Sequence, residues 1–156
     1  MEKMEKKNDL CERLLKFAVD VILYLRTVKN TVETIDTKRQ LIKASTSSGA
    51  NYEESQGSPT KPDVKTKIGI SLKEMSESNY FLRIYKCLKL GDVEKNTYLV
   101  NESSEIKRIL ASILNKLSIL FFLGLWTCLV GRQVWNLSVG LLRRGLEFFL
   151  HKDLFI

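Results

Sequence analysis

Apolar side chains recur at intervals of three and four residues along most of the first 117 positions, which is the spacing of one face of an α-helix. The first stripe starts at Asp9, a suitable N-cap residue, and weakens after Val28. The second helix is predicted to begin at a cap on Asp36 or Thr37 and to continue to about Ser55. No stretch alternates with the period of two that is typical of a half-buried strand, so the pattern predicts helices alone.

Two further stripes lie beyond a loop that holds both prolines of the chain. The third helix should run from the Lys61–Asp63 segment to Gly91, a residue well suited to a helix C-terminus. The polar segment Asp92–Asn101 is predicted to be a connection, and the fourth helix should start at Ser103 or the serine after it and reach Leu117. The four segments predict an all-α fold, an antiparallel up-and-down four-helix bundle with an extra apolar C-terminal tail. The third helix is apolar on more than one stripe, which favours self-association.

The segment Ala44–Glu54 holds seven consecutive small residues followed by Asn51 and a pair of carboxylates. Ser, Thr and Gly are poor helix formers, so tertiary packing must hold a helix here. Small side chains let another helix backbone approach closely. We therefore expect this segment to lie deep between its neighbours, with polar partners for Asn51 and the carboxylates.

From Ser118 to Ile156 the composition changes, because both Trp and five of the seven Phe lie here. We predict two parts, a bundle at residues 1–117 and an apolar extension at residues 118–156. The run Ile119–Val130 is shorter than the roughly 20 residues of a membrane-spanning helix, and a span over residues 118–142 would bury Arg132. Three interpretations stay open: a helix packed on the bundle or an oligomer, a membrane-associated anchor, or sequence without an evolved role, such as a read-through or shifted reading frame.

The charge balance, 25 Lys and Arg against 18 Asp and Glu, gives a net charge of +7 and permits nucleic acid or an anionic membrane as a partner. Without a basic run or interleaved aromatic residues, the support for RNA or DNA is weak and a membrane is disfavoured. The widely spaced Cys11, Cys87 and Cys128 and the single His151 argue against a zinc site or a disulfide framework. Free thiols and the lack of a secretory signal predict a cytoplasmic protein.

Catalytic chemistry is disfavoured by the same shortage of histidine. Four-helix bundles can hold paired metals with Glu and His ligands, but no His lies near the carboxylates of the two central helices. A Ser or Cys nucleophile would also lack a base, and no glycine-rich phosphate loop follows a strand. The sequence therefore predicts a protein that is not an enzyme and uses no cofactor.

Basic side chains at two helix starts are the candidate nucleic-acid contacts. They are Lys38, Arg39 and Lys43 on the second helix and Lys61, Lys65 and Lys67 on the third. In an antiparallel bundle the two groups lie near opposite ends, so they need not form one patch. In a ring-shaped oligomer each group would repeat once per subunit and could form a belt that neutralises phosphates.

Two motifs carry a family resemblance. The run Ser-Ser-Gly-Ala-Asn-Tyr-Glu-Glu ends at Glu54, and the run Leu-Lys-Glu-x-x-Glu ends at Glu77. In this order and at this separation they resemble the bacterial four-helix-bundle proteins encoded in intervening sequences of 23S rRNA genes. The resemblance covers roughly Asn8 to Leu117, and the chain departs from it after Leu117, where members of the family usually stop.

The resemblance implies a cytoplasmic bundle that assembles as a ring, commonly a homopentamer, without an established enzymatic activity. A related group, the accessory proteins of diversity-generating retroelements, binds a reverse transcriptase and nucleic acid, which gives the alternative function. The residues that match the family's polar motif are Ser48, Asn51, Glu54, Lys73, Glu74 and Glu77. We expect them to form a polar network that sets the register of the two central helices, without a catalytic role.

Overall fold

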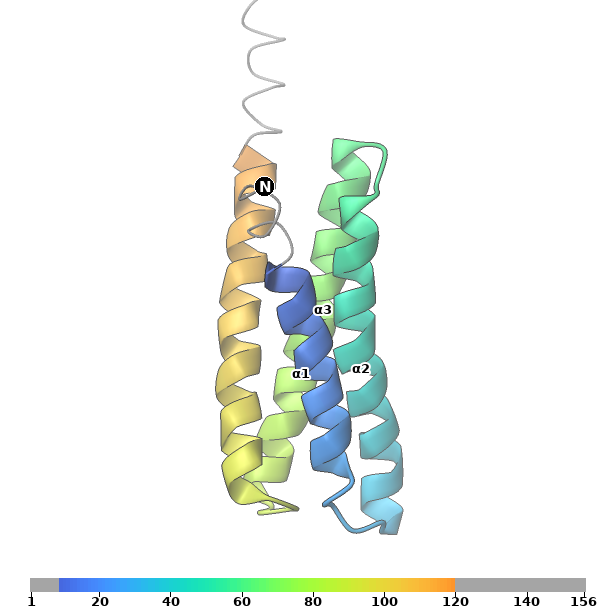
Figure 1. Ribbon diagram of the computed structural model, residues 1–156, viewed down its shortest axis with the longest axis vertical. Helices are drawn as coiled ribbons and strands as arrows, with labels where there is room; N and C mark the ends of the chain where they lie inside the picture. Colours follow the sequence, from blue (N-terminus) through green and yellow to red (C-terminus); the bar gives the residue numbers. More distant parts are fainter. Residues whose placement is uncertain (1–8, 120–156) are drawn as a thin grey trace, which may run out of the picture. The chain divides into compact units, whose positions relative to one another are not determined.

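The computed structural model describes residues 9–119, and these form four helices that run alternately up and down the long axis of a bundle (Figure 1). The bounds are Asp9–Leu25 for α1, Val32–Gln56 for α2 and Lys61–Cys87 for α3, and the fourth helix occupies residues 93–119. The described residues contain no strand, so the predicted all-α four-helix bundle is confirmed. None of the helices in this part is long and apolar enough to cross a membrane.

The chain divides between Leu117 and Ser118 into two units, and the bundle belongs to the first. The predicted C-terminal extension lies almost entirely outside the described residues, as does the alternative of a membrane anchor over residues 118–142.

Helix α2 begins at Val32, several residues before Asp36 and Thr37, so the predicted cap at one of these two residues was wrong. Thr31 is the N-cap: its hydroxyl accepts from the Thr34 backbone N–H at 3.3 Å, while the Thr31 N–H donates to the Thr34 hydroxyl at 2.8 Å. This reciprocal pair satisfies two N–H groups at the end of the helix and outweighs the low helix propensity of the β-branched residues. Asp9, the other predicted cap, is the first residue of α1.

The end of α3 also differs from the predicted stop at Gly91. The C-cap is Leu88, and Lys89 follows it in the left-handed region with φ 51°. The Lys89 N–H donates to the Lys86 carbonyl at 3.2 Å and the Leu90 N–H to the Tyr85 carbonyl at 3.1 Å, which is the hydrogen-bond pattern of a Schellman motif. A lysine therefore occupies the position that glycine usually takes.

Gly91 has a different role in the connection that follows. Its φ is 67°, and a Cβ atom there would lie 2.8 Å from the side chains of Thr27 and Val28. The fourth helix then begins at residue 93, where the Asp92 carboxylate accepts from the Lys95 N–H at 3.0 Å. The predicted polar connection Asp92–Asn101 is thus mostly helical.

The hydrophobic core contains residues from all four helices, and the contact between α2 and α3 is made by small side chains. Ser48 and Ser71 are fully buried and bond reciprocally, each hydroxyl donating to the other residue's carbonyl, at 2.9 Å from Ser48 and 2.8 Å from Ser71. The predicted deep position of the small-residue segment is confirmed at Ala44, Ser45 and Ser48, which are all buried.

Candidate functional site

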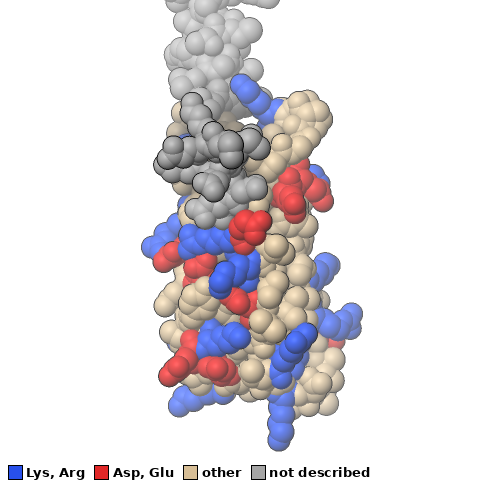
Figure 2. All heavy atoms as spheres, viewed as in Figure 1, with Lys and Arg blue, Asp and Glu red and all other residues tan. Residues whose placement is uncertain are grey.

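An apolar face along α1 is the first candidate site. Leu14, Phe17 and Val21 of this helix point into the core, while Leu15, Val19 and Leu23 form a second stripe at four-residue spacing. These three side chains are 59, 46 and 38% exposed. The view in Figure 2 shows mainly uncharged atoms where α1 and α2 run side by side.

A groove between α1 and α2 adjoins this stripe. It has a volume of about 220 Å³, and its lining residues are Cys11, Leu14, Leu15, Ala18, Thr46, Gly49, Ala50 and Glu53. The groove exists because α2 presents only small side chains to α1 at this level. Burial, and then the charges of Glu53 and Glu12, raise the pKa of the Cys11 thiol. The thiol is therefore kept protonated, which makes it a poor nucleophile, and the groove has the chemistry of an apolar contact surface.

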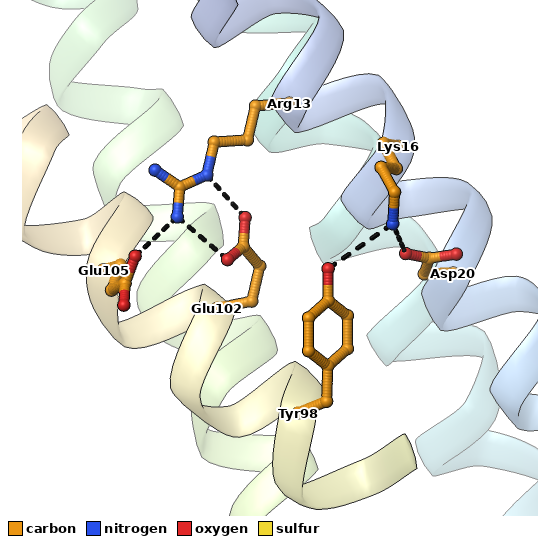
Figure 3. A network of polar contacts seen from close by, with 6 residues as sticks. All are labelled: Arg13, Lys16, Asp20, Tyr98, Glu102 and Glu105. Atoms are coloured by element: carbon orange, nitrogen blue, oxygen red, sulfur yellow. Dashed lines mark hydrogen bonds and ion pairs between the residues drawn. The ribbon is translucent and has the colours of Figure 1, made fainter.

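A charged network joins α1 to the fourth helix (Figure 3). The Arg13 guanidinium donates to both oxygens of Glu102, at 2.6 and 2.8 Å, and to Glu105 at 2.6 Å. These hydrogen bonds raise the pKa of Arg13 further above its usual range. A guanidinium held in this way stays charged near neutral pH and cannot act as an acid or a base, so the network serves to hold two helices together.

Next to this network, Lys16 donates to Asp20 at 2.5 Å and to the Tyr98 hydroxyl at 3.4 Å (Figure 3). Its ammonium group also lies 5.5 Å from the centre of the Tyr98 ring. The bond to Asp20, and then the bond to Tyr98, raise the pKa of Lys16. This contact is a second link between α1 and the fourth helix.

Buried polar side chains link the helices inside the bundle. The Tyr24 hydroxyl donates to the Leu90 carbonyl at 2.7 Å and accepts from the Asn96 amide at 2.9 Å. Asn79 donates to the hydroxyls of Ser103 at 2.8 Å and Ser104 at 3.1 Å. These hydrogen bonds cross the bundle and fix the positions of the helices. Among the described residues, the Asn96 side-chain oxygen is the one buried side-chain N or O atom without a hydrogen-bond partner.

The predicted polar motif is only partly brought together. Ser48 is buried against α3, but the Asn51 amide donates to the Ser47 carbonyl of its own helix at 2.9 Å. Glu54 pairs with Lys67, a residue outside the motif. In the described part of the chain, the side chains of Lys73, Glu74 and Glu77 have no hydrogen-bond or ion-pair partner, although the two carboxylates are half-buried. Among the described residues, no hydrogen bond or ion pair joins the α2 part of the motif to its α3 part. The network, and a role of these residues toward another molecule, stay predictions.

The predicted nucleic-acid contacts are dispersed. Lys38 donates to the Val28 carbonyl at 2.5 Å and to Asn30 at 2.7 Å, so it closes the α1–α2 connection. Arg39 lies 3.5 Å from Asp36. The remaining predicted contacts are Lys43, on the exposed side of α2, Lys61 and Lys65 in the first two turns of α3, and Lys67. They do not form one patch within the bundle.

The described residues contain no group of three or more potential metal-ligating side chains. In the described residues, ion pairs join α1 to the fourth helix, and α1 also exposes an apolar stripe to solvent. The described residues therefore define the structural class, a four-helix bundle, and this class alone assigns no activity.

The comparisons with known proteins place the chain in a family. A family model described as 23S rRNA-intervening sequence protein matches residues 6–112, and the chain belongs to this family. A similar solved structure is a protein with unknown function from the S23 ribosomal protein family of Bacteroides thetaiotaomicron. It is 28% identical, with a TM-score of 0.62, and the match covers 67% of this chain and 97% of that chain. No curated protein matches the chain significantly.

Proposed function

We propose that this protein is a non-enzymatic, self-assembling four-helix bundle and that the α1–α2 face is its interface with a second copy. The observation that carries the proposal is the stripe of Leu15, Val19 and Leu23, which is exposed to water although α1 already buries another stripe in the core. A contiguous exposed apolar stripe of this kind marks an interaction surface.

The groove beside the stripe supports the same proposal. Gly49 and Ala50 lack long side chains, so a helix or a large side chain of another molecule can approach the backbone of α2 closely. The motif resemblance favours a second copy as that molecule, since it implies a ring, with a pentamer as the leading state. We place this assembly in the cytoplasm and assign it the role of an interaction scaffold.

Light scattering after size exclusion, over a series of concentrations, tests the assembly. The full-length chain should be an oligomer at micromolar concentration. Leu15→Glu and Val19→Glu should shift it toward the monomer, because a carboxylate in an apolar contact is costly to bury. Ile70→Glu, at a similarly exposed apolar position on α3, should leave the oligomer intact. A wild-type monomer at these concentrations would refute the proposal.

Thiol labelling locates the interface independently. Cys11 lines the groove, whereas Cys87 is exposed at the end of α3. With the other cysteines replaced by Ser, alkylation of Cys11 should slow as the oligomer forms, and alkylation of Cys87 should not. Equal rates for Cys11 in the monomer and in the oligomer would show that assembly uses another surface.

Association with nucleic acid is a second proposal, favoured by the exposed Lys43 and Lys61 and by the net charge of +7. It includes the alternative in which the chain is an accessory protein of a reverse transcriptase. Binding to RNA or DNA should weaken steeply with salt if phosphate contacts carry it. Binding that is insensitive to salt would contradict a phosphate belt.

A further inference from the structure

We propose that one end of the bundle is a docking surface for an anionic lipid membrane. This basic end comprises residues 26–39, which hold the α1–α2 connection, and residues 83–96, which hold the connection from α3 to the fourth helix. Both connections lie at the same end of the bundle (Figure 1). They contact each other, since the Asp92 N–H donates to the Thr27 hydroxyl at 3.2 Å. The proposal does not depend on self-assembly.

The basic end carries much of the positive charge of the protein. Its two segments hold eight cationic and four anionic side chains, a net charge of +4. The cationic residues are Arg26, Lys29, Lys38, Arg39, Arg83, Lys86, Lys89 and Lys95. Within the described residues, only Lys38 and Arg39 of this set have a side-chain hydrogen bond or an ion pair. Six cations are therefore available to an anionic surface.

The same end exposes aliphatic side chains at its outermost positions. Val32 is the first residue of α2 and is 89% exposed, and the α3 C-cap Leu88 is 63% exposed. Val93 at the start of the fourth helix and Ile35 in the first turns of α2 are also exposed. Exposed aliphatic side chains in the same two segments as these Lys and Arg residues match a membrane interface, where the aliphatic groups enter the headgroup region and the cations meet lipid phosphates.

Lys89 adds a further observation. It has a positive φ at a position where glycine would be free of strain, so the chain holds a cation at the tip of the connection in an unfavourable backbone conformation. Replacement by Gly should remove both the strain and the charge. At this position a substitution can therefore weaken binding to the membrane without lowering the stability of the fold.

The aliphatic side chains favour lipid over nucleic acid as the partner. Proteins that hold single-stranded nucleic acid usually combine cations with exposed aromatic rings, on which bases stack. The large hydrophobic side chains exposed at the basic end are all aliphatic, and the exposed Tyr80 and Tyr98 lie outside its two segments. A phosphodiester chain would engage the cations but would leave Val32 and Leu88 in water, whereas a bilayer accounts for both.

An environment-sensitive fluorophore reports the docking directly. In the full-length chain with Cys11, Cys87 and Cys128 replaced by Ser, the label is attached through Val32→Cys. Vesicles of phosphatidylcholine with phosphatidylglycerol should shift its emission to the blue, and phosphatidylcholine alone should not. The matched control places the label through Lys61→Cys, at the opposite end of the bundle, where no shift is expected. No shift at position 32, or equal shifts at both positions, overturns the proposal.

Co-sedimentation with the same anionic vesicles measures the contribution of single residues. Lys89→Gly should weaken binding about five-fold, because one cation near an anionic surface contributes about that factor, while the thermal midpoint stays equal or rises. Val32→Ser should also weaken binding, and Lys61→Gln should not. Unchanged binding in both end variants would mean that another part of the chain holds the vesicle. If these variants weaken RNA binding and the emission of the fluorophore at position 32 does not shift with vesicles, the surface is a nucleic-acid site and the proposal fails.

Discussion

Gly49→Ala tests the geometry of the α1–α2 contact, because the two properties it changes should move in opposite directions. A Cβ atom at this position would meet the Leu14 Cβ at 3.7 Å and the Leu14 backbone at 3.9 and 4.0 Å. These are ordinary van der Waals distances, so alanine fits without displacing α1. The substitution also removes a glycine from the interior of a 25-residue helix.

The expected gain follows from helix propensity. Alanine is more favourable than glycine by up to about 1 kcal/mol in a helix interior, and the new methyl group adds contact with Leu14. We expect the free energy of unfolding to rise by about 0.5 to 1.5 kcal/mol. The thermal midpoint should then rise by a few degrees. In the oligomer the same methyl group occupies part of the groove, so association should weaken.

Urea unfolding followed by circular dichroism, repeated at several protein concentrations, separates the two effects. Gly49→Leu is the matched variant, because its longer side chain extends beyond the space beside Leu14 and should cost about 1 to 3 kcal/mol. A loss of stability with Gly49→Ala would show that α1 lies closer to α2 than the structure has it. Tighter association would contradict the location of the interface.

Two further substitutions test the polar contacts. Burial raises the pKa of Tyr24 to about 12, above an ordinary value near 10, so its contribution to stability is complete below pH 10 and is lost as the pH rises through 12. Tyr24→Phe should lower the free energy of unfolding by about 1 to 3 kcal/mol at neutral pH, because the Asn96 amide loses one of its acceptors. In urea unfolding from pH 8 upward, the free energy of unfolding should fall less steeply with pH in this variant than in the parent. Arg13→Met should cost about 1 to 3 kcal/mol, because it leaves the carboxylates of Glu102 and Glu105 side by side without their cation. Calorimetry should show part of this loss recovered in Arg13→Met with Glu102→Gln, and no recovery would mean that the ion pair is not the source of the effect.

The sequence predicted the number and type of the helices but misplaced several of their ends. Apolar spacing is dictated by burial, which acts over a whole helix, so the four stripes were visible. Helix ends depend on single hydrogen bonds. The Thr31 cap lay in a segment of poor helix formers, and Lys89 took a position for which Gly91 was the natural candidate.

The polar contacts were harder to predict because their partners are distant in sequence. Arg13 and Glu102 are 89 positions apart, and nothing in the local pattern joins them. The sequence gives a clearer signal at Asn79, because this residue interrupts the otherwise apolar stripe of α3 and a buried amide requires hydrogen-bond partners. Asn96 was missed because the segment around it was interpreted as a connection. The motif residues Lys73, Glu74 and Glu77 were correctly placed on a helix, but the partners expected for them on α2 form no hydrogen bond or ion pair with them in the described residues.

The reciprocal bonds between Ser48 and Ser71 have a consequence for folding kinetics. Between Leu41 and Tyr52 the buried residues of α2 are Ala44, Ser45 and Ser48, so no large side chain in this stretch opposes a slip of α2 along α3 by one turn. A slipped hairpin would bury both hydroxyls without their acceptors, at about 1 to 3 kcal/mol for each. Slipped intermediates should therefore be short-lived in the parent. Replacing both serines with alanine should convert them into kinetic traps, which would appear as a slow second phase in refolding.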